Sequence, residues 1–133
     1  MQELLDIGVE EYRIVGGGVL RFHPGDPNLF ARFLRAEEEI QALEKTFSQA
    51  AQDGKEMLAL MEEADTKIKE ILNGVFGGDN DFHKALCGVN LLAVDGSGVS
   101  LATRLFGALE QVLKAGANRF AKQQAEKLIV DNG

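Results

Sequence analysis

The first hydrophobic segment of the chain alternates around a run of glycines. β-Branched and aromatic residues lie on both sides of three consecutive glycines: Tyr12, Ile14 and Val15 before them, and Val19, Leu20 and Phe22 after them. Glycine adopts positive φ without strain, and such residues between two apolar runs are typical of a tight turn joining antiparallel strands. The pattern predicts a β-hairpin over residues 9–22.

A change from strand to helix is predicted directly after this hairpin. Pro24 has no N–H to donate to a strand, and Asp26 is a favoured helix N-cap. Pro27 suits the first helical position, because the N–H that it lacks has no partner there in any helix. These residues predict that a helix begins at position 27.

From residue 27 to residue 73, small and apolar residues repeat every seven positions. One heptad position holds Phe33, Ile40, Phe47, Gly54, Met61 and Ile68, and another holds Ala36, Leu43, Ala50, Met57, Ala64 and Ile71. Lys and Glu fill most of the positions between them, as expected for the solvated side of a helix. We call these two sets the heptad stripe, and they predict a coiled-coil-like helical segment over residues 27–73.

The heptad stripe leaves two arrangements open at Gly54. Its register crosses this glycine without a slip, which favours one continuous rod. The residues Gln52-Asp53-Gly54 also suit a turn, so a helical hairpin is the alternative. The stripe itself is either core, buried against the C-terminal helix, or a seam for another chain.

Two further helices are expected in the second half of the chain. A short helix over residues 81–87 fits between glycine-rich segments, with Asp79 or Asn80 as its cap. A last helix is expected over residues 99–130, with Ser97 or Ser100 as its cap. The predicted fold is therefore mainly α, with an N-terminal β-hairpin, in a single domain over residues 1–133.

Composition narrows the range of partners. The net charge of −7 makes nucleic acid and anionic membrane poor candidates, because phosphate groups bind clusters of Lys and Arg. The longest uninterrupted apolar stretch, residues 91–94, is far shorter than the roughly 20 residues of a membrane-spanning helix. The start of the chain does not resemble a signal peptide, and the single cysteine cannot form an intramolecular disulfide. We therefore expect a cytoplasmic protein that binds other proteins.

No motif for catalysis, metal or cofactor stands out. Residues 79–90 begin like a calcium loop, but His83 and Lys84 occupy the fifth and sixth positions, where an EF-hand needs an oxygen ligand and a glycine. His83 and Cys87 are four residues apart on the predicted short helix, where they would form a nucleophile and its base. A lone cysteine between apolar residues is more often a small core residue. We expect no enzyme, no cofactor and no metal site.

The order of segments resembles a known family. The stretch 7–12, then residues 19–33, which read VLRFHPGDPNLFARF, resemble the start of the tail assembly chaperones of long-tailed phages and prophages of Gram-positive bacteria. Residues 68–78, which read IKEILNGVFGG, resemble a later stretch of that family, and a short helix and a final helix follow it there as here.

This resemblance implies a non-enzymatic protein of the bacterial host cell. Members of that family bind the tape-measure protein and keep it soluble while tail-tube subunits polymerise around it. The candidate binding surface on this chain is drawn from the heptad stripe: Phe33, Ile40, Leu43, Phe47, Met57 and Met61. The alternative function is that of a structural or regulatory coiled-coil module that forms a homo-oligomer through the same residues.

Overall fold

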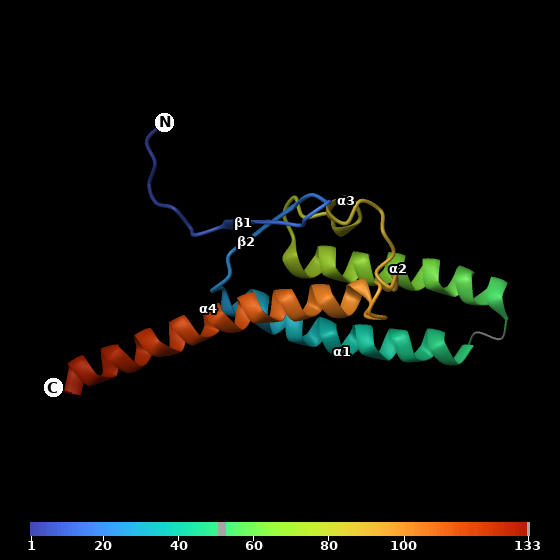
Figure 1. Cartoon of the computed structure of the whole chain (residues 1–133). Helices are drawn as coiled ribbons and strands as arrows, with labels where there is room; N and C mark the ends of the chain where they lie inside the picture. The colour runs from blue at the N-terminus through green and yellow to red at the C-terminus, as the bar shows by residue number, and fades with distance from the viewer. Residues whose placement is uncertain (51–52, 133) are drawn as a thin grey trace.

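The chain is mainly helical, with a two-stranded antiparallel hairpin near its N-terminus (Figure 1). A computed structural model describes residues 1–50 and 53–132. The elements in chain order are β1 (Glu10–Arg13), β2 (Val19–Phe22), α1 (Pro27–Ala50), α2 (Gly54–Phe76), α3 (Phe82–Ala85) and α4 (Leu101–Asn132). The prediction of a mainly α fold with an N-terminal hairpin is confirmed at this level.

The hairpin turns where the glycines predict it. Tyr12 pairs with Leu20, and the Ile14 N–H donates to the carbonyl of Gly18 over 2.9 Å. Gly16 has a φ of +80°, a conformation that glycine adopts without strain. The first strand is shorter than expected, because it ends at Arg13 and residues 14–15 already belong to the turn region.

The predicted start of the first long helix is confirmed. Pro27 is the first residue of α1, and the Asp26 carboxylate accepts a hydrogen bond from the Asn28 N–H over 2.9 Å. The Asp26 carbonyl accepts from the Phe30 N–H, which completes the first turn.

The helical segment is a hairpin of two helices, so the favoured continuous rod is wrong. Asp53 has extended backbone angles (φ −141°, ψ 174°), and its carboxylate caps α2 by accepting from the Glu56 N–H over 2.7 Å. A residue with such backbone angles cannot lie inside an α-helix. The adjoining turn residue Gln52 lies outside the described residues. Helix α2 continues beyond the predicted end at residue 73 to Phe76, and α1 and α2 pack side by side (Figure 1).

The first half of the heptad stripe in α1 and the last half in α2 form the core. Phe33, Ile40 and Ile68 are at most 1% exposed. They belong to a single cluster of buried side chains that also includes residues of the β-hairpin, α3 and α4. The ring centroids of Phe33 and Phe76 lie 6.3 Å apart in an edge-on arrangement that favours aromatic pairs. The interpretation of the stripe as core therefore holds for these residues.

The short helix is smaller than predicted and has a different cap. Helix α3 spans only Phe82–Ala85, and the carboxylate of Asp81, rather than Asp79 or Asn80, accepts from the N–H of His83 over 3.0 Å. It ends early because Cys87 takes a positive φ of 52°. The loop beyond it is held by an ion pair inside the protein.

That ion pair joins Asp65 and Lys69, one turn apart in α2. The Lys69 Nζ lies 2.9 Å from Asp65 Oδ2 and donates to the Val89 carbonyl over 2.9 Å. The other carboxylate oxygen of Asp65 accepts from the Leu91 N–H over 2.8 Å. The carbonyl of Leu91 in turn accepts from Ala102 N–H, in the first turn of α4. A chain of hydrogen bonds thus connects the middle of α2 to the start of α4.

Helix α4 begins at Leu101, two residues after the predicted start at residue 99. The Ser100 hydroxyl accepts from the Thr103 N–H over 3.1 Å, so Ser100 is the cap. The first half of α4 crosses the α1–α2 hairpin, and the second half projects beyond the body of the protein (Figure 1). At the crossing, Gly116 is buried against the Pro24–Gly25 turn, where a Cβ would lie 2.1 Å from the Pro24 carbonyl oxygen.

Replacing Gly116 by Ala is expected to destabilise the protein by about 1–3 kcal/mol, because the added methyl group forces α4 away from the Pro24 carbonyl. Gly107→Ala in the same helix is the matched control. A Cβ at Gly107 meets nothing within 4 Å, so this variant should gain about 0.5–1 kcal/mol from helix propensity. Urea unfolding of both variants measures the difference, and equal effects would contradict the close approach at Gly116.

Replacing Lys69 by Met is expected to cost about 3–5 kcal/mol, because it leaves the buried Asp65 carboxylate without its cation. Lys67→Met is the matched control, since Lys67 and Glu63 form an exposed pair at the same spacing in the same helix. That variant should change stability by no more than about 1 kcal/mol. Urea unfolding is again the measurement, and a Lys69→Met cost as small as the control's would show that the pair does not hold the loop.

Candidate partner-binding grooves

The structure separates the six predicted partner-binding residues into core and surface. Phe33 and Ile40 are 0% and 1% exposed, so they cannot contact a partner while this fold is kept. The ring of Phe33 lies 6.4 Å from that of Phe106 in α4, measured between centroids. Helix α4 thus covers this part of the heptad stripe, and the prediction for Phe33 and Ile40 is corrected. The other four residues line two separate grooves.

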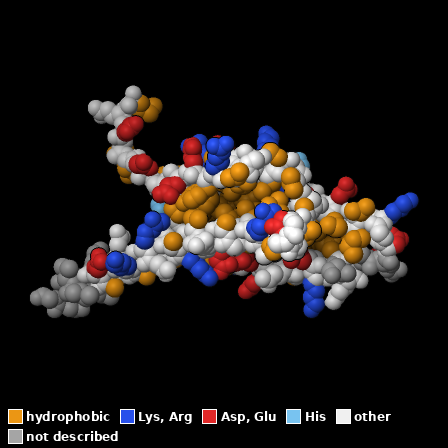
Figure 2. Space-filling model, viewed as in Figure 1, with side chains coloured by type: hydrophobic (Ala, Val, Ile, Leu, Met, Phe, Trp, Pro, Cys, Tyr) orange, Lys and Arg blue, Asp and Glu red, His pale blue; other side chains and the backbone are white. Residues whose placement is uncertain are grey.

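The first groove lies at the end of the α1–α2 hairpin where the two helices join. Phe47 comes from α1, Met57 and Met61 come from α2, and Leu92 comes from the loop before α4. We call it the open-end groove, because its residues lie past the start of α4, which does not cover this end of the hairpin. It has a volume of about 280 Å³ and is lined by Glu44, Phe47, Met57, Leu60, Met61, Ala64, Leu92 and Ser100. A hydrophobic patch is visible over this end of α2 in the space-filling view (Figure 2).

Most of the open-end groove is apolar, with one carboxylate at its edge. Burial raises the pKa of Glu44 above its usual value, because water is partly excluded from the charged form. Met57 is 41% exposed, which is high for a large apolar side chain. The Lys67 ammonium lies over the Phe47 ring, 5.5 Å from its centre. Its positive charge is attracted to the face of the ring and stabilises the position of Phe47. The groove therefore offers flexible thioethers and an aromatic ring beside negative charge.

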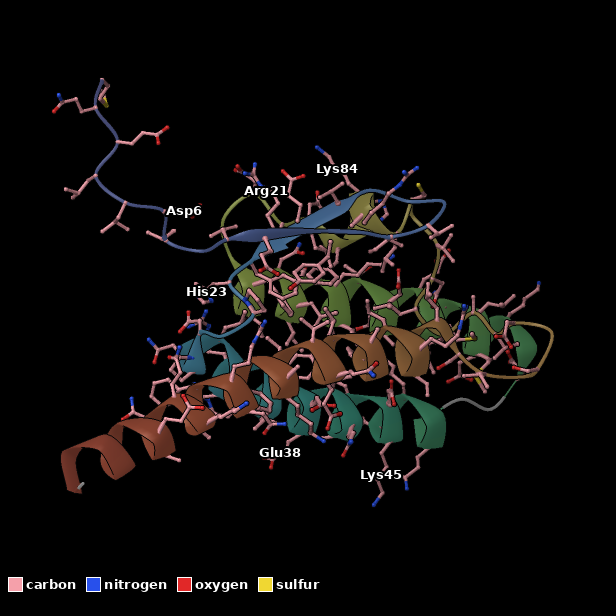
Figure 3. The ribbon with its side chains drawn as sticks, turned by 60° about the vertical axis from the view of Figure 1, so that its left-hand side comes forward. Asp6, Arg21, His23, Glu38, Lys45 and Lys84 are labelled. Atoms are coloured by element: carbon pink, nitrogen blue, oxygen red, sulfur yellow. The ribbon has the colours of Figure 1, made fainter. Side chains whose placement is uncertain are left out.

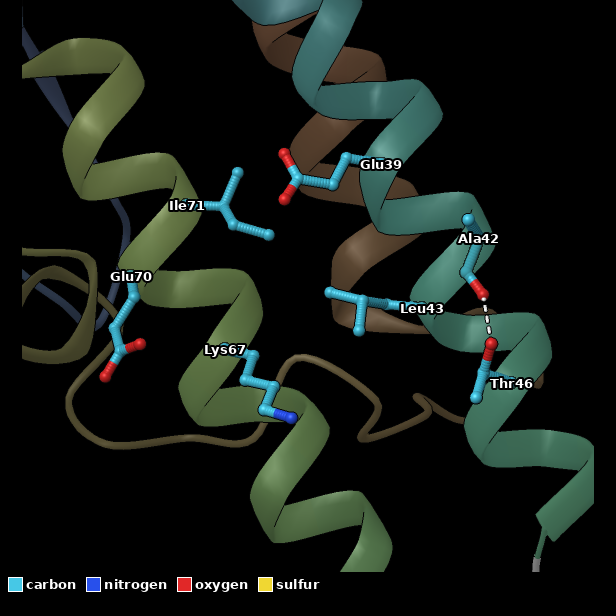
Figure 4. Close-up of a pocket in the computed structure, with 7 residues that line it drawn as sticks. All are labelled: Glu39, Ala42, Leu43, Thr46, Lys67, Glu70 and Ile71. Carbon is cyan, nitrogen blue, oxygen red and sulfur yellow. Dashed lines mark hydrogen bonds between the residues drawn. The ribbon is translucent and has the colours of Figure 1, made fainter.

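The second groove follows the seam between α1 and α2. Leu43 and Ile71 point toward one another across it (Figure 4). We call it the seam groove; it has a volume of about 560 Å³ and is lined by Glu39, Ala42, Leu43, Thr46, Lys67, Glu70 and Ile71. The Thr46 hydroxyl donates to the carbonyl of Ala42 over 3.0 Å and is therefore directed back to its own helix. With three charged side chains in its lining, the seam groove is more polar than the open-end groove.

The four exposed residues of the predicted binding surface are therefore split between the two grooves. Phe47, Met57 and Met61 come together in the open-end groove, and Leu43 lies in the seam groove. Leu92 and Ser100 reach the open-end groove from the loop before α4, and no spacing in the sequence indicates this. Leu60, by contrast, follows from the helix period, because it lies three residues after Met57 and four before Ala64.

The residues of the rejected catalytic and calcium motifs have structural contacts. Cys87 lies beyond the end of α3, and its thiol donates to the carbonyl of Gly16 over 3.3 Å rather than facing His83 from the same helix. The Asn80 side chain binds the backbone of Arg21, accepting from its N–H and donating to its carbonyl, each over 2.8 Å. Asn80 therefore pairs with the outer edge of β2 much as a neighbouring strand does, a role that the sequence did not indicate.

Over residues 1–50 and 53–132, no group of three or more His, Cys, Asp or Glu side chains is placed to hold a metal ion. None of the helices in that part of the chain combines the length and the apolar character needed to cross a bilayer. Comparisons with protein-family models, with curated proteins and with solved structures find no match to this chain.

Proposed function

We propose that this chain is a non-enzymatic tail assembly chaperone that binds a tape-measure protein and keeps it soluble in the cytoplasm of a bacterial host cell. The observation that carries the proposal is the open-end groove, an apolar, methionine-lined surface on an acidic protein. The resemblance of residues 7–12, 19–33 and 68–78 to that family supplies the kind of partner.

The chemistry of the groove suits a segment of amphipathic helix. A tape-measure protein is expected to be very long and helical, and apolar faces exposed along such helices aggregate unless they are covered. A groove between two helices accepts the apolar face of a third helix, with side chains at helical spacing as anchors. Met57 and Met61 adapt to anchors of different shapes because their side chains are unbranched and flexible.

Charge complements this apolar contact. The chain carries a net charge of −7, and Glu44 lies in the lining of the groove. A helix with Lys or Arg beside its apolar face would bind here better than an acidic one, because it would compensate the partly desolvated carboxylate of Glu44. Excess negative charge also opposes the association of complexes with one another. Tail-tube subunits would then meet a tape measure that is still soluble.

The decisive experiment is co-expression with the long tape-measure-like protein encoded next to this chain. The expected result is that an otherwise insoluble partner becomes soluble and co-purifies with the chain. If the partner stays insoluble and no complex forms, while the chain by itself forms a stable homo-oligomer, the proposal is wrong and the self-associating module takes its place.

A pair of adjacent substitutions in α2 tests the groove. Met57→Asp places a charge in the open-end groove and should weaken binding of the partner at least about tenfold, or about 1.4 kcal/mol. Leu58→Asp is the matched control, because Leu58 is 66% exposed and does not line either groove. Titration calorimetry of the two purified variants with a soluble tape-measure fragment measures the difference. Equal binding by both variants would move the binding site elsewhere on the chain.

A further inference from the structure

The outer edge of β1 presents unpaired backbone groups. Ile14 donates to Gly18 across the hairpin, and alternation along an antiparallel ladder then directs the backbone groups of Tyr12 and Glu10 toward β2. The backbone N–H and C=O groups of Glu11 and Arg13 point the other way. Within the described parts of the chain, no backbone or side-chain hydrogen bond reaches these outward-facing groups.

The opposite edge of the same hairpin is already covered. The backbone N–H and C=O of Arg21, which face outward from β2, both bind the side chain of Asn80. The outer edge of β2 is thus covered at Arg21 by its own chain, whereas the outer edge of β1 has no such contact among the described residues. Open strand edges are sites where a further strand adds through main-chain hydrogen bonds.

An apolar surface lies directly beside the open edge. Hydrophobic side chains gather between the β-hairpin and α4 in the space-filling view (Figure 2). Partly buried apolar residues from both sides pack against the core there, including Tyr12 in β1 and Val112 in α4. A strand added along β1 would lie over this surface and cover it on one face.

The first nine residues lie outside the core and carry exposed apolar side chains. We call residues 1–9 the N-terminal arm; it runs away from the body of the protein (Figure 1), and Asp6 marks its course in the side-chain view (Figure 3). Leu5 and Ile7 are 68% and 70% exposed. The Asp6 carboxylate accepts from the Gly8 N–H over 2.8 Å and Gly8 has a φ of +87°, so a turn separates the arm from β1 and leaves both side chains exposed.

Charges of the arm and of α4 are complementary. The arm carries Glu3 and Asp6 and no Lys or Arg. Burial raises the pKa of Tyr12 in β1 to about 12, and the positive charge of Arg119 on α4 opposes that shift. Arg119 and Lys122 form no salt bridge among the described side chains. An acidic strand along β1 would therefore be attracted by the positive charge of Arg119.

We propose that the N-terminal arm of one copy of this chain adds as a strand to the outer edge of β1 in a second copy. Leu5 and Ile7 then cover the apolar surface between β1 and α4 of that second copy, and the acidic arm is attracted by its Arg119. Because every copy carries both an arm and an open edge, the exchange is reciprocal and gives a closed dimer. This surface is separate from the open-end groove, so it does not depend on the proposed function.

Sedimentation of the full chain over a concentration series tests the exchange. The unaltered chain and the control Leu58→Asp should form dimers. Leu5→Asp with Ile7→Asp in the arm should raise the dimer dissociation constant at least about a hundredfold, because both apolar contacts are lost in each of two reciprocal sites. These arm residues make no contact with the core, so this variant keeps the fold.

A second variant tests the edge itself. Glu11→Pro removes the outward-facing N–H and keeps the hydrogen bonds between β1 and β2, since proline is tolerated on an edge strand whose N–H faces solvent. It should abolish dimers as the arm variant does. A monomeric unaltered chain, or dimers that survive both variants, would overturn the proposal.

Hydrogen exchange distinguishes an arm that pairs with β1 of a second copy from an arm that folds back on β1 of its own chain. The amides of Glu11 and Arg13 should become protected as the protein concentration rises, and they should exchange freely in the arm variant. Protection that is the same at every concentration would show that the arm pairs with its own β1, and the exchange between copies would then be wrong.

Discussion

The buried pair of Asp65 and Lys69 fixes the position of α4, and both surfaces of the molecule depend on that position. Asp65 holds the backbone of Leu91 against α2, and Leu91 accepts from the first turn of α4. Two charges out of water are costly unless every lone pair and proton finds a partner, and here the carboxylate and the ammonium both bind backbone groups as well as each other. Because the buried pair needs these backbone partners, it holds the loop between α2 and α4 in one position.

Once α4 is placed, the apolar residues of α1 and α2 have unequal surroundings. Phe33 and Ile40 are covered by α4 and the facing helix, whereas Phe47, Met57 and Met61 lie past the start of α4 and form the open-end groove. The loop that the ion pair holds contributes Leu92 to the same groove. A single heptad stripe thus supplies core at one end and an apolar groove at the other, which is the surface that the proposed function assigns to a partner.

The same placement of α4 creates the apolar surface beside β1. Gly116 lets α4 approach the Pro24–Gly25 turn closely, and this brings the helix under the hairpin. Asn80 covers the edge of β2 at Arg21, but the edge of β1 stays open above this surface. The two surfaces lie on different elements, so the two proposed contacts do not overlap.

The sequence alone determined the elements whose causes are local. Consecutive glycines specify the hairpin turn, Asp26 and Pro27 specify the start of α1, and seven-residue spacing specifies the helical segment. It did not determine whether the helix continues at Gly54, because a heptad register is the same in a rod and in a hairpin, and only the capping conformation of Asp53 distinguishes them. Nor did it separate Phe33 and Ile40 from Phe47, Met57 and Met61, which share one periodicity. Tertiary structure decided that, because burial depends on which part of the stripe α4 covers, and the position of α4 is fixed by contacts between residues far apart in the chain.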